Sequence, residues 1–252
     1  MERYVRQIIV PEFGEEGQKK LFKAKVLVAG AGGLGSPVIA YLAAAGVGKL
    51  GIVDGDVVEE SNLQRQIIHA GKIGMNKAES AKEFVEKLNP DVEVETYPFR
   101  ITPENVMDLI ADYDVIVSCP DNLVTRYILN DACRITGKPM VHAAIYGFEG
   151  EAMTIKKSPC YRCIFPEAPE GAGTRAVMGF TAGLFGCIQA AETIKLIAGL
   201  PTLEGKLLRI DLLTMEVFEI PFSENPNCPV CSGKLKEIHP ENYTGNCRVV
   251  KY

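Results

Sequence analysis

The sequence predicts an α/β protein with a Rossmann-like, mostly parallel sheet that is continued by antiparallel strands. In the first 145 residues, short apolar segments alternate with amphipathic segments of helical period, and a glycine-rich turn follows the first apolar segment. Further along, the alternation gives way to strand-like segments on either side of one long apolar helix. The chain has 252 residues, which is enough for one large domain of this class.

The first half is expected to repeat a β–α unit, which implies a parallel sheet with right-handed crossovers. Four of its strands are short apolar segments, typical of buried parallel strands, and are placed at 25–30, 49–54, 114–119 and 140–144. The fifth, at 92–97, alternates like a strand. The helices of this half are expected at 1–23, 37–45, 77–88, 103–111 and 123–136. Helix 37–45 has Pro37 in its first turn and Gly46 just past its end. Helix 77–88 follows Asn76, a good N-cap, with Glu79 at the capping-box position.

The second half is expected to be antiparallel. Strands are predicted over 150–155 and 207–221, and an apolar helix over 181–197. The segment 164–179 is rich in Gly and Pro, which indicates an exposed crossover loop. We therefore expect a single domain over 1–231, with halves at about 1–145 and 146–231, and a polar C-terminal tail over 232–252.

Composition argues against two classes of partner. The net charge is −5 and no basic stretch is present, so we expect no nucleic-acid binding. No segment reaches the roughly 18 apolar residues of a membrane span, so no membrane partner is expected. The N-terminus lacks the apolar segment of a signal peptide, which favours a cytoplasmic location.

The glycine-rich turn predicts a nucleotide site. Gly30, Gly32, Gly33 and Gly35 stand between a predicted strand and a predicted helix, where the backbone can approach a phosphate closely. Asp54 ends the second strand, at the place where an acidic side chain binds a ribose hydroxyl. Taken alone, these residues also fit an NAD-dependent oxidoreductase or a tight turn without a ligand.

Three further charges favour ATP with Mg²⁺ over NAD. Arg65 follows the second strand. Lys77 lies in the first turn of a predicted helix, where a cation is unfavourable because it opposes the helix dipole. A bound polyphosphate would explain a lysine at this position. Asp121 follows a strand at the ligand edge of the sheet, and a carboxylate there can bind Mg²⁺. Together they suit a triphosphate and its metal.

Two Cys-x-x-Cys pairs, Cys160/Cys163 and Cys228/Cys231, predict a closed tetrahedral zinc site. Four thiolates leave no open position for water, so the zinc is expected to be structural. A redox dithiol is the alternative function of such cysteines. The metal would tie the start of the crossover loop to the segment after the last strand.

Together these residues resemble the MoeB/ThiF/HesA family, the bacterial relatives of ubiquitin-activating enzymes, and the MoeB type most of all. The resemblance runs from about Arg3 to Cys231. It rests on Arg3–Gln7, the glycine turn 30–35, Asp54-Gly55-Asp56, Ser61–Gln66, Lys77, Cys119–Asn122 and the two cysteine pairs.

The resemblance implies a homodimer with two ATP sites. Gly33 is then expected to contact the phosphates, Asp54 the ribose, and Asn62, Arg65 and Lys77 the triphosphate, while Asp121 binds Mg²⁺. The resemblance also implies that Arg6 reaches into the neighbouring subunit's site. The remaining expected nucleotide contacts are Gly30, Gly32, Gly35, Asp56, Ser61, Gln64 and Asn122.

The activity that the resemblance implies is ATP-dependent adenylation of a ubiquitin-like sulfur-carrier protein of the ThiS or MoaD type. The carrier's C-terminal Gly-Gly carboxylate attacks the α-phosphate and pyrophosphate leaves; residues 146–231 would bind the carrier. No rhodanese domain is appended, so a separate sulfur donor is expected. Alternatives are a same-fold enzyme acting on tRNA threonylcarbamoyladenosine or on a peptide, an NAD-dependent oxidoreductase, and a zinc-stabilised binding module.

The expected crossover loop contains no cysteine for a covalent link to the carrier, and reads Gly173-Thr174-Arg175 at the corresponding place. Cys187, Cys119 and Cys133 lie in apolar segments and are expected to be core thiols. Cys247, in the tail, is the cysteine expected to be exposed. Activation is therefore expected to stop at the acyl-adenylate.

Overall fold

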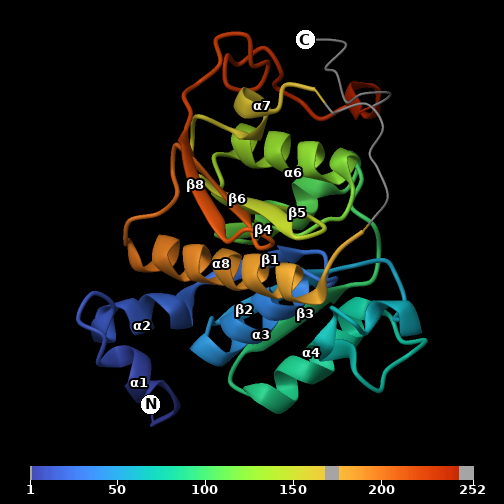
Figure 1. Cartoon of the computed structure of the whole chain (residues 1–252), viewed down its shortest axis with the longest axis vertical. Helices are drawn as coiled ribbons and strands as arrows, with labels where there is room; N and C mark the ends of the chain where they lie inside the picture. Colours follow the sequence, from blue (N-terminus) through green and yellow to red (C-terminus); the bar gives the residue numbers. More distant parts are fainter. Residues whose placement is uncertain (1, 168–175, 244–252) are drawn as a thin grey trace.

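The fold was analysed in a computed structural model, which describes residues 2–167 and 176–243 (Figure 1). The N-terminal segment contains a short turn, η1 (Glu2–Tyr4), and two helices, α1 (Val5–Ile8) and α2 (Gly14–Lys23). The single helical segment expected there is interrupted, because Pro11 cannot continue a helix and Gly14 has a positive φ of 61°.

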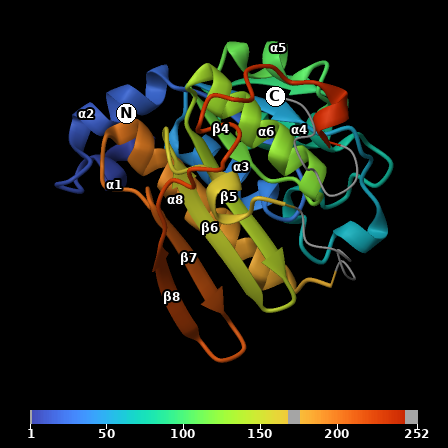
Figure 2. The ribbon, with the colours of Figure 1, turned by 90° about the horizontal axis from the view of Figure 1, so that it is seen from above.

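One eight-stranded sheet forms the centre of the molecule, in the order β3-β2-β1-β4-β5-β6-β7-β8. The strands are β1 (Lys25–Ala29), β2 (Lys49–Val53), β3 (Glu93–Tyr97), β4 (Val115–Ser118), β5 (Met140–Tyr146), β6 (Glu149–Ile155), β7 (Lys206–Asp211) and β8 (Glu216–Pro221). The first five strands pair in parallel and the last three continue the sheet antiparallel (Figure 2). The predicted fold class is confirmed.

Helices cover both faces of the parallel part (Figure 1). One layer contains α3 (Gly35–Ala45), α4 (Lys77–Leu88) and α8 (Gly179–Ala198). The other contains α5 (Val106–Ala111), α6 (Leu123–Thr136) and the short α7 (Tyr161–Ile164). Single 3₁₀ turns are η2 (Glu60–Asn62), η3 (Ile67–His69) and η4 (Pro240–Tyr243).

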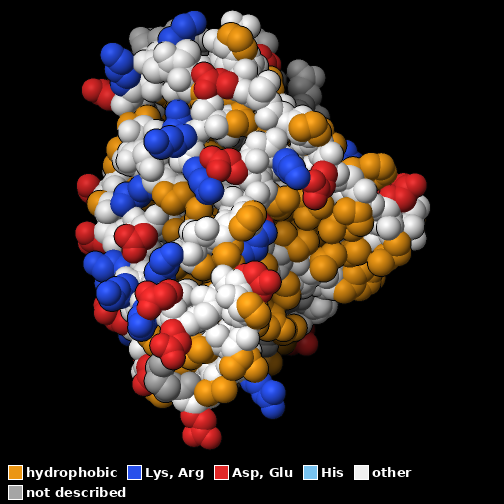
Figure 3. All heavy atoms as spheres, turned by 90° about the vertical axis from the view of Figure 1, so that its left-hand side faces the viewer, with side chains coloured by type: hydrophobic (Ala, Val, Ile, Leu, Met, Phe, Trp, Pro, Cys, Tyr) orange, Lys and Arg blue, Asp and Glu red, His pale blue; other side chains and the backbone are white. Residues whose placement is uncertain are grey.

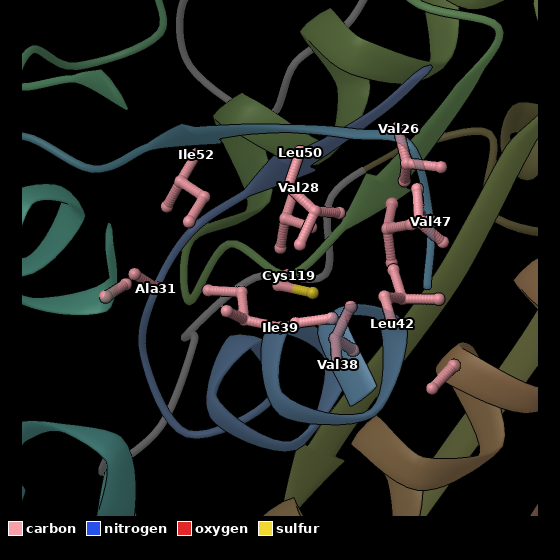
Figure 4. Packing of buried hydrophobic residues seen from close by; sticks show 14 of the residues in the cluster. Val26, Val28, Ala31, Val38, Ile39, Leu42, Val47, Leu50, Ile52 and Cys119 are labelled. Carbon is pink, nitrogen blue, oxygen red and sulfur yellow. The ribbon is translucent and has the colours of Figure 1, made fainter. Parts of the chain in front are cut away.

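The core under the glycine turn fixes α3 against the sheet. Figure 4 shows Ile39 and Leu42 of α3 facing Val28 of β1 and Leu50 of β2. All four side chains are fully buried. Burial of each contributes about 1.5–3 kcal/mol, so the start of α3 is held rigidly beside the end of β1.

The strand order creates a crevice at one edge of the sheet. From β1 the chain runs outward through β2 and β3, and then crosses back to β4 on the other side of β1. The connections after β1 and β4 therefore leave in opposite directions. In open α/β sheets, ligands bind outside the carboxyl ends of the strands at this switch point.

Helix boundaries follow the sequence pattern to within a few residues, except at the divided N-terminal segment. Helix α4 has the predicted bounds, and the Asn76 side chain accepts from the N–H groups of Ala78 and Glu79, as its predicted N-cap role requires. The expected capping-box role of Glu79 is wrong, because its carboxylate accepts from the Thr96 hydroxyl instead. Helix α5 begins at Val106 rather than at 103.

The segment expected as a tail packs on the molecule as far as the structure describes it. Leu235 and Tyr243 are only 4% and 6% exposed, and both contribute to the core that includes α6. Within residues 2–167 and 176–243, no helix has both the length and the apolar character needed to cross a membrane.

Candidate nucleotide and metal sites

The turn after β1 accepts only glycine at two places. Gly30 has φ +106°, and a Cβ there would lie 2.8 Å from the Cys119 carbonyl oxygen. A Cβ on Gly35 would overlap the Gly30 carbonyl. These contacts press the turn against the end of β4 and start α3 directly behind it. The first-turn N–H groups of α3 thus lie at the switch point.

Asp54 joins the end of β2 to this turn. One carboxylate oxygen accepts from the Ala31 N–H at 2.8 Å and the other from the Asp56 N–H at 2.9 Å. Burial raises the pKa of Asp54, and these two hydrogen bonds act in the opposite direction. Each carboxylate oxygen can accept a second hydrogen bond, and the expected contact with a ribose stays a prediction.

Lys77 has a defined structural partner. Its Nζ lies 3.6 Å from Asp56 Oδ2, and its side chain is 9% exposed. Asp56 also accepts from Arg100 at 3.0 Å. The Asn76 amide donates to the carbonyls of Asp54 and Asp56, so the start of α4 is tied to the end of β2. Arg100 is a cation of this cluster that the sequence analysis missed, since it follows β3 without any motif.

The segment 61–66 lies over the glycine turn. A Cβ on Gly33 would lie 3.3 Å from Arg65 Cδ, so the arginine stem covers Gly33. The Arg65 guanidinium donates to the Ser61 carbonyl at 3.2 Å. Asn62 is buried and its side-chain oxygen accepts from the Glu59 N–H, which fixes the turn from which Arg65 extends. Ser61 and Gln64 are exposed.

A hollow of about 500 Å³ opens beside Arg65. Apolar side chains and glycines line most of it, and Arg65 and Gln64 supply its polar groups. The lining residues are Pro37, Gln64, Arg65, Ile67, Met178, Gly179, Phe180 and Gly183. The hollow therefore lies between the start of α8 and the segment that covers the glycine turn.

Asp121 and Asn122 follow the neighbouring strand β4. Both are exposed, and the Asn122 side chain caps α6 by accepting from the Thr125 N–H at 2.9 Å. The close approach of Gly30 to Cys119 brings this connection beside the glycine turn. The expected site residues are thus gathered around the carboxyl ends of β1, β2 and β4. Their individual roles stay predictions.

Arg6 lies elsewhere. It is exposed on α1, and the neighbouring Gln7 donates to the carbonyl of Ala45, the last residue of α3. The glycine turn lies at the other end of α3, which has 11 residues and is therefore about 16 Å long. Arg6 is thus remote from the glycine turn of its own chain.

The four cysteines of the two pairs meet, as predicted. Their sulfur atoms all lie within 4.8 Å of one another. The Cys160–Cys228 and Cys163–Cys231 separations are 3.6 Å and 3.7 Å. Sulfurs bound tetrahedrally at about 2.3 Å from zinc are about 3.8 Å apart, so this cluster fits the ion.

A buried ion pair supports the first cysteine pair. Arg162 and Asp131 are both fully buried and hydrogen-bonded at 2.8 Å. The Tyr243 hydroxyl donates to Asp131, and the Arg162 guanidinium lies 4.4 Å from the centre of the Tyr127 ring. Removing one partner of such a pair costs about 3–5 kcal/mol. The network connects α6, α7 and η4, and no local sequence signal predicts it.

The other three thiols that the structure describes, Cys119, Cys133 and Cys187, are not suited to act as nucleophiles. Burial raises the pKa of Cys133 to about 12 and raises that of Cys119 strongly as well, as expected for core thiols. Cys187 is expected from the sequence to be a core thiol, but it is only partly buried. Its partial burial still raises its pKa. The residues 173–175 and Cys247 lie outside the described residues.

Comparison with known proteins agrees with these features. The family model described as "ThiF family" matches residues 4–230. The "SAMP-activating enzyme E1" of Haloferax volcanii is 49% identical over 258 residues, covering 99% of this chain and 96% of that protein. The "Sulfur carrier protein adenylyltransferase" of Thermus thermophilus is 40% identical, covering 98% of this chain and 96% of that protein.

A solved structure shows the same fold. The crystal structure of E. coli MccB with succinimide has a TM-score of 0.83 at 23% identity, and the match covers 91% of this chain and 73% of MccB. The predicted enzyme class, a nucleotidyltransferase, is confirmed by relatives that are named adenylyltransferases. The predicted resemblance is confirmed as well: the chain belongs to the ThiF family.

Proposed function

We propose that the protein is an ATP-dependent adenylyltransferase that activates the C-terminal glycine of a ubiquitin-like sulfur-carrier protein. One observation carries the proposal: Arg65 covers Gly33 of the glycine turn, and the buried Lys77 lies beside Asp56, close to the Asp54 carboxylate that binds the same turn. Two cations and a row of backbone N–H groups suit a triphosphate better than a dinucleotide. The relatives named for SAMP and sulfur carriers supply the class of acyl substrate.

The chemistry requires little from the side chains. A carboxylate oxygen of the carrier's last glycine attacks the α-phosphorus, the bond to the bridging oxygen of pyrophosphate breaks, and an acyl-adenylate forms. The carboxylate is already ionised at neutral pH, so no general base is needed. Arg65 and Lys77 neutralise charge on the phosphates and orient them for in-line attack.

Mg²⁺ and zinc have separate roles in the proposal. Asp121 would hold Mg²⁺, since its exposed carboxylate follows β4 at the switch point and supplies the oxygen ligands that this ion prefers. The ion would neutralise charge on the leaving pyrophosphate. Zinc on the four cysteines would be structural, because all four positions are taken by sulfur.

The carrier has a suitable surface to dock on. Figure 2 shows the β7–β8 hairpin projecting from the body, and Figure 3 shows a broad hydrophobic area on the projecting part. Leu213, Met215 and Val217 of this hairpin are 70%, 72% and 61% exposed. Exposed apolar groups at this density favour a protein partner. The hollow of about 500 Å³ beside Arg65 would receive the extended Gly-Gly tail of the carrier.

A homodimer completes the proposed site. Arg6 is exposed on α1, beside the end of α3 that is remote from the glycine turn. From this position it can contact the nucleotide site of a second copy. The activated carrier would then receive sulfur from a separate donor protein.

The test is pyrophosphate release from the chain mixed with ATP, Mg²⁺ and purified ThiS- or MoaD-type carriers. We expect release that depends on a carrier and disappears when the last glycine of the carrier is removed. NAD in place of ATP serves as the control for an oxidoreductase. A chain that is stabilised by NAD but not by ATP with Mg²⁺, and that releases no pyrophosphate, would refute the proposal.

A further inference from the structure

His69 is a fully buried histidine next to the nucleotide site. Its Nε2 lies 2.7 Å from the carbonyl oxygen of Ala31, inside the glycine turn. Its Nδ1 lies 2.8 Å from the hydroxyl of Ser80, in the first turn of α4. One side chain thus spans the two elements that carry the glycine turn and Lys77.

The hydrogen bonds fix which nitrogen carries the proton. A carbonyl only accepts, so Nε2 must donate to Ala31. In the neutral ring, Nδ1 then accepts from the Ser80 hydroxyl. Burial lowers the pKa of His69, and the positive charges of Lys72 and Lys77 act in the same direction. Asp54 faces the other side of Ala31, where it accepts from the backbone N–H.

The donated proton orients a peptide group of the turn. Asp54 holds the N–H of Ala31 and His69 holds its carbonyl. In a planar trans peptide the carbonyl and the next N–H point in opposite directions, so the Gly32 N–H points away from His69. Within the described residues this N–H makes no hydrogen bond. It is therefore available to a phosphate oxygen.

The other ring nitrogen acts on α4. Ser80 lies one turn after Lys77, and its carbonyl accepts from Lys72 Nζ at 2.6 Å. The start of α4 is thereby held at a fixed distance from the glycine turn. A shift between the two elements would move Lys77 away from Asp54 and His69, the two side chains that bind the turn at Ala31.

We propose that His69 is a positioning residue of the nucleotide site: it aims the Gly32 N–H at a phosphate through Ala31 and holds Lys77 beside the turn through Ser80. This inference rests on the proposed function, because it assumes that the ligand carries phosphates.

Two substitutions separate positioning from packing. His69→Gln places an amide nitrogen as far along the side chain as Nε2, so it can still donate to Ala31. His69→Asn places its nitrogen only at the Nδ1 position, so it can reach Ser80 but not Ala31. Both keep a polar, uncharged group in the same space. Binding of ATP with Mg²⁺ to the full chain without a carrier is measured by calorimetry, and thermal melting of each variant is recorded alongside.

We expect His69→Asn to weaken ATP binding about tenfold, since it leaves a buried carbonyl unpaired and frees the Gly32 peptide to rotate. His69→Gln should stay within about threefold of the unchanged chain. In pyrophosphate exchange the loss should appear mainly in KM for ATP, because the phosphates are held before and during the reaction.

Each outcome decides the point. Equal ATP affinities in His69→Asn and the unchanged chain would overturn the inference while leaving the proposed function intact. Should His69→Asn fail to fold, a folded His69→Gln that binds ATP more than tenfold worse would also overturn it. Absence of ATP binding in the unchanged chain would remove the proposed function itself, and this inference with it.

Discussion

Lys77 shows how one residue can be kept at an unfavourable position. A cation in the first turn of a helix opposes the helix dipole. Here Asp56 lies beside the ammonium group, and Asn76 ties the start of the helix to the carbonyls of Asp54 and Asp56. The chain thus holds a buried cation beside the end of β2, and its neighbours offset the unfavourable interaction with the helix dipole.

Replacing this cation or Arg65 should reduce activity without unfolding the chain. Lys77→Ala and Arg65→Ala are each expected to lower ATP–pyrophosphate exchange at least tenfold, since one well-placed cation contributes about 2.7–4 kcal/mol in such sites. Lys87→Ala is the matched control, an exposed lysine at the other end of α4. Near-normal exchange in both site variants would remove the proposed triphosphate site.

His142 is a second buried histidine, and the nucleotide site does not use it. It lies on β5 beside Ser118 of β4, and neither ring nitrogen has a hydrogen-bond partner among the described residues. Burial lowers the pKa of His142 well below its usual value, and the charge of Arg126 adds to the effect. The ring packs edge-on against Tyr161, with centres 4.7 Å apart.

This histidine should make folding sensitive to acid. Its pKa is lower in the folded chain than in the unfolded chain, so the unfolded chain takes up the proton first. Its effect on stability is absent above about pH 6.5, and below that pH it destabilises by up to about 1.4 kcal/mol for each pH unit. Urea unfolding at pH 7.5 and 5.5 measures this.

The comparison variant is His142→Phe, which keeps a ring against Tyr161 and cannot titrate. It is expected to lose less stability between the two pH values than the unchanged chain. Protonation of the zinc ligands affects both proteins alike and cancels in the difference. Equal losses would show that His142 does not carry the effect.

At the scale of elements, the sequence pattern predicted the strands and helices whose positions depend on neighbouring residues. Four of the parallel strands are apolar segments of the right length and β3 alternates, while α4 and α6 have their predicted bounds because Asn76 and Asn122 cap them. The break between α1 and α2 had a local signal as well, in Pro11 and Gly14. The packing of residues 232–243 depends on contacts that the pattern does not contain. The same holds for His69 and the Asp131–Arg162 pair, whose partners lie 11 to 38 positions away.

The cysteine cluster joins α7 to the segment after β8, so removing its metal should loosen both. We expect about one zinc per chain, and loss of that zinc with a large fall in melting temperature in Cys228→Ser. Cys187→Ser, at a partly exposed thiol outside the cluster, should keep its metal. Metal content by atomic emission and melting by circular dichroism are the measurements; a metal-free but equally stable chain would contradict a structural role.

At the scale of the whole molecule, the position of Arg6 leads to a test of the proposed dimer. Arg6→Ala and Lys77→Ala should each be inactive alone, because each removes one part of every site. Mixed and refolded together, they form dimers in which one site receives both intact residues. About a quarter of the unchanged activity should return for random pairing. Activity no higher than in the separate variants would refute a shared site.

The contact of Tyr243 with Asp131 bears on where the domain can be divided. The family match ends at residue 230, within the second cysteine pair and before this tyrosine. A chain cut there would lose Cys231 as well as the hydroxyl that covers a fully buried ion pair. We therefore expect the smallest autonomous folding unit to extend at least to Tyr243, and a fusion partner or affinity tag to be tolerated best beyond it.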